Sequence, residues 1–255
     1  AADLVVQNLS PFKGDVLLFN RIGSDAAKPF HFDEQFKSRA CDLKSAGYRI
    51  VNREGVEYLQ VAMSFYQTLS VWQQCEASVV FDINGDRQGD FELGGVFPEN
   101  LQGLELKESS SVLVDMHEAK QIRDAARAGK TKVDYTAAVK AVSPLIFHPY
   151  SDVVILEVAN DTLKELFKTE MVKIQLALLH EDGSVDESDD FLGTQTYRSL
   201  SLNAADQAFA QLPEISSIKP TSEETLLLQR GKGQGDLLAF YPLNSKNDRT
   251  QAVIK

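Results

Sequence analysis

The chain has 255 residues, of which 43% are hydrophobic and 25% charged, and this balance excludes a disordered protein. Its net charge is −11 and its 26 Lys and Arg form no sustained cluster, so we expect no nucleic-acid partner. No apolar run approaches the roughly 20 residues of a membrane helix, and the first residues lack a signal-peptide pattern. The acidity favours solubility or cation binding.

The first half of the chain reads mainly as β-strands. Short runs rich in Val, Ile, Leu and aromatic residues are bounded by Gly, Asn, Asp or Pro. The predicted strands are 2–8, 15–20, 48–52, 56–65, 69–72, 76–82, 90–95 and 110–116. Strands at this regular spacing, with turn residues between them, predict a mainly β protein with an antiparallel β-sandwich of the jelly-roll or immunoglobulin-like kind.

Two short helices are predicted to cap or connect the sheets. Residues 117–129 place alanines and Ile122 at helical spacing and end at Gly129, a typical helix stop. Residues 160–170 begin with Asn160 as the expected N-cap and carry an apolar stripe of Leu and Phe.

Strands resume in the second half of the chain. The predicted runs are 151–158, 172–180, 194–202, 224–230 and 236–243. Residues 213–223, with two prolines and three serines, read as an extended connector, and residues 224–243 as a β-hairpin turning at GKGQG. We therefore predict a sandwich domain over 1–210 and a connector with a C-terminal strand pair over 211–255, which is able to pack on the same sandwich.

The stretch FDINGDRQGDFELGG (81–95) crowds oxygen-bearing side chains between two strand-like runs. Ca²⁺ takes six to eight oxygen ligands, and alternating Asp and Asn residues on a tight loop direct their oxygens to one point. The first, third, fifth and ninth positions of such a loop, with Gln88 between the last two, give the predicted calcium ligands Asp82, Asn84, Asp86, Gln88 and Asp90.

Two features of this loop differ from the helix–loop–helix calcium pattern. The sixth position is Arg87 instead of Gly, and the twelfth is Leu93 instead of a bidentate Glu. The alternative interpretation is a hairpin in which Asn84 and Gly85 form the turn and the acids only solvate it.

The rest of the chain carries no catalytic motif, so no catalytic residue is predicted. The four histidines have no metal-site spacing, and no GxSxG occurs. The acidic stretch 180–193 reads as a solvated loop, and GKGQGD (231–236) as a flexible turn. Cys41 and Cys75 form one disulfide if the compartment is oxidising, and are otherwise two buried thiols.

Three segments together resemble a known family. The hairpin VVFDINGDRQGDFEL, the later SDVVILEV and IQLALLHEDGSVDESDD, and the final GQGDLLAFYPLNSKNDRTQAVI resemble parts of the accessory domains that follow the catalytic domain in large secreted bacterial subtilisin-like serine proteases. The similarity runs in order over about residues 40–255, through short motifs.

The resemblance implies a non-catalytic role. The family's Asp-Thr-Gly, His-Gly-Thr and Gly-Thr-Ser-Met motifs are missing from this chain, so it corresponds to a tail whose partner is an N-terminal catalytic protease domain. It implies a secreted protein, which favours the Cys41–Cys75 disulfide. It also implies a structural Ca²⁺ and a role in stability, substrate docking or attachment to a protein or cell-surface ligand.

Two other functions stay open from the sequence. A free-standing carbohydrate-binding or adhesion module is the main alternative, although a single tryptophan, Trp72, and scattered tyrosines do not favour a sugar-binding platform. The third is a hydrolase of unfamiliar type that uses acids near Asp82 and Asp186.

Overall fold

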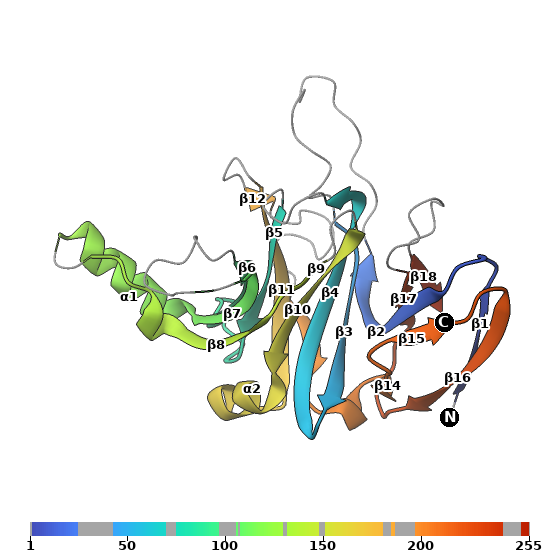
Figure 1. The fold of residues 1–255 in the computed structure, drawn as a ribbon. Coiled ribbons are helices and arrows are strands. Elements are labelled where there is room, and N and C mark those ends of the chain that lie inside the picture. The colour runs from blue at the N-terminus through green and yellow to red at the C-terminus, as the bar shows by residue number, and fades with distance from the viewer. Residues whose placement is uncertain are drawn as a thin grey trace.

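The computed structural model describes residues 2–24, 43–69, 75–96, 106, 108–129, 132–147, 151–180, 185–186, 197–241 and 251–254. These residues form three antiparallel sheets with short helices at the periphery (Figure 1). The predicted mainly β, sandwich-type fold is confirmed.

The largest described sheet has eight strands. Their spatial order is β18 (Gln251–Ile254), β17 (Leu237–Phe240), β2 (Gly14–Ser24), β3 (Leu43–Arg53), β4 (Val56–Leu69), β10 (Ser151–Ala159) and β9 (Ile146–Phe147), with β15 (Ser216–Ile218) also paired to β2.

The other described strands form two further sheets. The seven-stranded sheet has the order β12 (Val185–Asp186), β11 (Met171–His180), β5 (Cys75–Asp82), β6 (Phe91–Val96), β7 (Ser110–Asp115) and β8 (Val139–Pro144), with β13 (Arg198–Ser201) also paired to β11. The three-stranded sheet has the order β1 (Ala2–Asn8), β16 (Ser222–Arg230) and β14 (Phe209–Gln211).

The main core lies between the eight-stranded and seven-stranded sheets. Because side chains alternate along a strand, β4 directs Leu59, Val61 and Met63 to this core, and the facing strands contribute residues such as Phe81 and Phe91. The Phe81 and Phe91 rings lie 5.2 and 4.9 Å from the ring of Phe167. Burial of such side chains is the main stabilising contribution to a sandwich.

Two smaller cores involve β2. On one face of this strand, Val16 and Leu18 pack with residues of the three-stranded sheet such as Phe209 and Leu228. On the other face, Leu17 and Phe19 pack in a separate cluster whose members on the neighbouring strands are Ala62, Val153, Ile155, Leu238 and Phe240. The eight-stranded sheet is therefore apolar on both faces around β2.

The β3–β4 hairpin fixes the register of the largest sheet. Glu54 and Gly55 have φ of 55° and 87°, and Arg53 pairs with Val56 across them. Positive φ at both central residues is typical of a two-residue type I′ turn, which matches the twist of the strands it joins. The continuous register that follows places Arg49 directly opposite Gln60.

The two helices match the predicted ones, with one difference in capping. Helix α1 (Met116–Arg127) is capped by Asp115, whose Oδ1 accepts from the Glu118 N–H at 3.0 Å. Helix α2 (Asn160–Phe167) begins with Asn160 inside the helix, so the predicted N-cap is wrong. The side chain of Asn160 is buried and donates instead to the Leu202 carbonyl at 2.8 Å.

The segment GKGQG does not join a hairpin. Strand β16 pairs with β1 and β14, whereas β17 pairs with β2 and β18, so the predicted pairing of 224–230 with 236–243 is wrong. Gly231 and Gly233 lie against backbone atoms of Gln207 and Asp206, where an added Cβ would come within 2.1 and 2.5 Å. The glycines let the chain pass closely over this turn from one sheet to the other.

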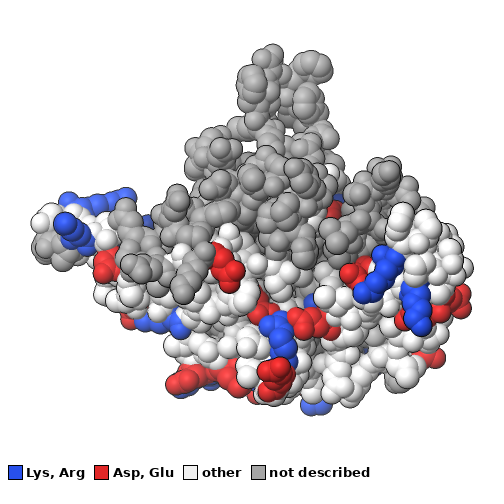
Figure 2. Space-filling model, in the orientation of Figure 1, with Lys and Arg blue, Asp and Glu red and all other residues white. Residues whose placement is uncertain are grey.

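Two observations concern the helices and the surface charge of the described residues. Within these residues no helix is long and apolar enough to cross a membrane. On the face shown in Figure 2, acidic and basic side chains of the described residues are interspersed among uncharged ones.

Candidate functional site

The predicted calcium loop is the connection between β5 and β6. Phe81 pairs with Phe91, and the Asp90 N–H donates to the Phe81 carbonyl at 2.8 Å, so the strands close the loop tightly at its base. The loop is thus a β-hairpin connection, as the flanking strand patterns predict.

Asp82 anchors the inside of the loop. Its side chain is almost fully buried, and its two carboxylate oxygens accept from the Gly85 N–H at 2.6 Å and from the Arg87 N–H at 3.1 Å. A carboxylate that accepts two backbone N–H groups satisfies donors that a strand partner would otherwise take.

The other predicted ligands hold the loop in the same way. Asn84 Oδ1 accepts from the Asp86 N–H, and Asp86 Oδ1 accepts from the Gln88 N–H, both at 2.8 Å. Asp90 accepts from the Ile83 N–H at 2.8 Å and from Asn84 Nδ2 at 3.2 Å. The structure therefore brings Asp82, Asn84, Asp86 and Asp90 together in one hydrogen-bonded loop, while the exposed Gln88 contributes its backbone N–H.

Arg87, at the sixth position, adopts the backbone conformation that a glycine would take there. Arg87 has φ of 67°, the left-handed conformation for which glycine is preferred. Gly85 has φ of 82°, and an added Cβ at Gly89 would approach the Val80 side chain to 2.4 Å. Arginine in place of glycine thus adds backbone strain at position 87 but leaves the path of the loop unchanged.

The loop concentrates negative charge. Partial burial, followed by the charges of Asp82, Asp86 and Asp90, raises the pKa of Tyr197. The Tyr197 hydroxyl donates to the Arg87 carbonyl at 3.4 Å. Among the described residues, however, no group of three or more His, Cys, Asp or Glu side chains is arranged to hold a metal ion as it stands.

Several other predicted features fall outside the described residues. These are Cys41 and most of the acidic stretch 180–193. The predicted disulfide between Cys41 and Cys75 therefore has no structural account. The described Asp186 pairs with Leu178, whereas Asp82 pairs with Lys173, five residues away on β11. Five residues of strand span about 17 Å. The backbone positions of the two acids are therefore far apart along this strand.

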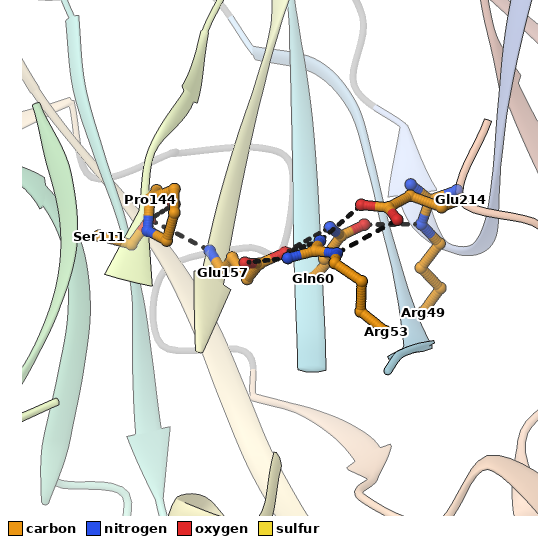
Figure 3. A network of polar contacts seen from close by, with 7 residues as sticks. All are labelled: Arg49, Arg53, Gln60, Ser111, Pro144, Glu157 and Glu214. Atoms are coloured by element: carbon orange, nitrogen blue, oxygen red, sulfur yellow. Dashed lines mark hydrogen bonds and ion pairs between the residues drawn. The ribbon is translucent and has the colours of Figure 1, made fainter. Parts of the chain in front are cut away.

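A second polar site lies on the face of the eight-stranded sheet that points away from the main core. Arg49, Gln60 and Glu157 stand in one row on the adjacent strands β3, β4 and β10, because Gln60 pairs with both of the others. All three side chains are buried. Arg49 Nε donates to Gln60 Oε1 at 2.8 Å, and Gln60 Nε2 donates to Glu157 Oε2 at 2.6 Å (Figure 3).

Arg53, four residues after Arg49 on β3, connects this row to Glu214 through two ion pairs. Its guanidinium donates to both carboxylate oxygens of Glu157, at 3.1 and 2.7 Å, and to both oxygens of Glu214. Hydrogen bonds to Glu157 and Glu214 raise the pKa of Arg53. Two arginines and two glutamates thus balance in formal charge, as a buried cluster requires.

Arg49 is the most enclosed charge of this cluster. Its guanidinium stacks on the Phe19 ring, 4.2 Å from the ring centroid, and Nη1 donates to the carbonyls of Leu18 and Pro213 at 3.2 and 2.8 Å. Burial lowers the pKa of Arg49 to about 9, although Glu214 and Glu157 raise it, so the group is still protonated at neutral pH.

A cavity of about 210 Å³ adjoins this cluster. Its lining includes Arg49, Gln60 and Glu214 of the cluster, and is otherwise mainly apolar, with Leu17, Ile146, Val153, Ile155 and Ile215 together with Asp15 and Ser151. A concave, mainly apolar space with a few converging polar groups has the features of a small-molecule site.

The sequence contains a signal for this cluster that the strand predictions left out: polar residues inside apolar strands. Arg49, Gln60 and Glu157 each interrupt an apolar strand, in the runs YRIVN, YLQVA and VILEV. A charged or amide residue inside such a strand is buried only with a partner. Which residues pair follows from the strand order, and the individual strands do not reveal that order.

The comparisons with known proteins do not assign this chain to a family. It matches no protein-family model, no curated protein and no solved structure.

Proposed function

We propose that the chain is a non-catalytic β-sandwich domain whose 82–90 loop binds Ca²⁺, and that it serves as an accessory domain of a secreted subtilisin-like protease. The observation that carries the calcium part is that three carboxylates and one amide belong to a single closed, hydrogen-bonded loop, where, after partial burial, the charges of the three acids raise the pKa of Tyr197. The accessory role rests on the sequence resemblance.

The oxygens of the loop retain capacity for a cation. A carboxylate oxygen can accept more than one hydrogen bond. In this loop, each of these oxygens accepts one described N–H group. Ca²⁺ would bind to the remaining lone pairs of these oxygens. At Asp86 and Asp90, it would also replace hydrogen bonds within the loop. The cation would offset the repulsion among the acids and so stabilise the hairpin.

A calcium titration of chelator-treated protein tests this proposal. With a dissociation constant of about 10⁻⁴–10⁻³ M, typical of extracellular modules, about 10 mM Ca²⁺ would stabilise the fold by roughly 1.4–2.7 kcal/mol. The melting temperature should rise, and calorimetry should show one bound ion. Mg²⁺ at the same concentration should give a smaller effect, because it requires a tighter octahedral site.

The variant Asp90→Asn should reduce this shift, because it removes one charge from the loop. Asp124→Asn is the matched control, because it is the same chemical change at an exposed position on α1, outside the loop. Equal calcium shifts in both variants, or no shift in the unmodified protein, would sink the calcium proposal.

The accessory role has a separate test. The coding sequence upstream of Ala1 should encode a subtilisin-like catalytic domain, and that domain should lose thermal stability or substrate affinity when this chain is deleted. A gene without such a domain would reject the accessory role and leave the calcium loop to be judged by its titration.

A further inference from the structure

The cavity beside Arg49 has hydrogen-bond donors on its wall without acceptors. A guanidinium has five N–H groups. In Arg49 the Nε and Nη1 groups donate to Gln60, Leu18 and Pro213, and no described residue accepts from Nη2. The side chain of Arg49 is only 1% exposed, so little solvent reaches it. A buried donor without a partner costs free energy unless something in the cavity accepts from it.

Ser151 places a second donor in the lining of the cavity, six residues before Glu157 on β10. Its Oγ accepts from the Val153 N–H at 3.1 Å, and no described residue accepts its hydroxyl hydrogen. Ser151 is 4% exposed and lines the cavity with the alternate residues Val153 and Ile155 of β10. Part of the apolar lining is thus on the same strand as this donor.

The acids near the cavity are already engaged. Both oxygens of Glu214 accept from Arg53, and Asp15 Oδ1 accepts from the Ser217 hydroxyl at 2.6 Å. Arg49 and Arg53 balance Glu157 and Glu214, and Asp15 adds one further negative charge at the wall. An anionic ligand would meet this charge, whereas an uncharged acceptor would satisfy the free donors at no electrostatic cost.

We propose that the cavity is a binding site for a small, uncharged, mainly apolar molecule with one carbonyl acceptor, such as an aryl or alkyl ketone. The carbonyl accepts from Arg49, and the hydrocarbon part packs against Leu17, Val153 and Ile155. A cavity of 150 Å³ accommodates benzene, so 210 Å³ fits a ring with a short carbonyl substituent, roughly eight to ten non-hydrogen atoms. This site is independent of the proposed calcium loop.

Acetophenone, toluene and benzoate test the proposal as probes of similar size. Each is titrated into isotope-labelled protein, and chemical-shift changes at Ser151, Val153 and Ile155 report binding. Acetophenone should bind about tenfold more tightly than toluene, because a hydrogen bond to a charged donor is lost with toluene. Benzoate should bind more weakly than acetophenone. The proposal is overturned if no probe shifts these residues, or if toluene or benzoate binds as tightly as acetophenone.

Two variants locate the site. Val153→Phe fills the cavity and should abolish acetophenone binding, whereas Val142→Phe, the same change at an exposed position on β8, should leave it unchanged. If Val153→Phe does not fold, Val153→Leu, which fills the cavity in part, serves instead. It should weaken the binding of both acetophenone and toluene, and unchanged affinities would contradict the site.

Discussion

The 82–90 loop and the buried row on β3, β4 and β10 both pair carboxylates with donors of the protein, but they do so over different distances in sequence. In the loop, the hydrogen bonds of Asp82 and Asp90 reach residues three to seven positions away. In the row, Arg49 reaches partners between 11 and 164 positions away. A local cluster forms with its own turn, whereas the row exists only after the sheet has assembled. We therefore expect the row to contribute more to global stability and the loop to act locally.

Removing Glu157 should have the largest effect. Glu157→Ala leaves the buried Gln60 amide and part of Arg53 without their acceptor, and should lower the free energy of unfolding by about 3 kcal/mol, less than for a fully buried pair because Arg53 is 37% exposed. Glu214→Ala, which removes the partly exposed partner of the same arginine, should cost less than about 1 kcal/mol. Urea denaturation measures both, and equal losses would contradict the difference in burial.

Removing Asp82 should cost less. Asp82→Ala frees the Gly85 and Arg87 N–H groups inside the loop, and should lower the unfolding free energy by about 1–2 kcal/mol. The exposed Asp86 holds one N–H group, so Asp86→Ala should cost about 0.5 kcal/mol. Denaturation with a chelator present isolates these effects from any cation. An Asp82→Ala loss as large as that of Glu157→Ala would mean that the loop is not merely local.

A smaller change, with the opposite sign, is expected at Arg87. Glycine relieves the left-handed strain there, so Arg87→Gly should stabilise the protein by about 0.5–1 kcal/mol. Lys168→Gly, at the end of α2 with φ of 55°, makes the same exchange outside the loop and should give a similar gain. Thermal denaturation measures both, and a loss of stability in Arg87→Gly alone would show that the arginine side chain has a role in the loop.

The smallest effect concerns pH. Burial by itself would raise the pKa of Glu57, but hydrogen bonds from Asn160 and Lys164 and the charge of Lys164 lower it overall. A lowered folded-state pKa stabilises the protein above the unfolded-state pKa, and this contribution disappears as pH falls through the folded-state value. The stability advantage over Glu57→Gln should therefore be present at pH 7, begin to fall near the ordinary Glu pKa of 4.5 and vanish as the pH passes below the lowered folded-state pKa. Parallel denaturation curves across pH check this, and a constant difference would contradict it.

The elements that the sequence predicted well depend on local patterns. Alternating strands such as 56–65, the stop of α1 near Gly129 and the turn at 82–90 all follow from residues a few positions apart. The pairing of β16 and β17 with separate sheets was not predictable in this way, because Gly231 and Gly233 owe their role to the distant turn at 205–207. For the same reason the cavity was missed, since its lining comes from strands whose order is set by the whole fold.

The arrangement around β2 has a consequence for the order of events during synthesis. This strand lies between β3, which follows it closely in sequence, and β17, which is made more than 200 residues later. Until residues 237–240 leave the ribosome, the Leu17–Asn20 backbone of β2 is an open, apolar sheet edge, and such edges recruit other chains. Folding of this protein should therefore be completed only late in translation, and fragments that stop before β17 should aggregate.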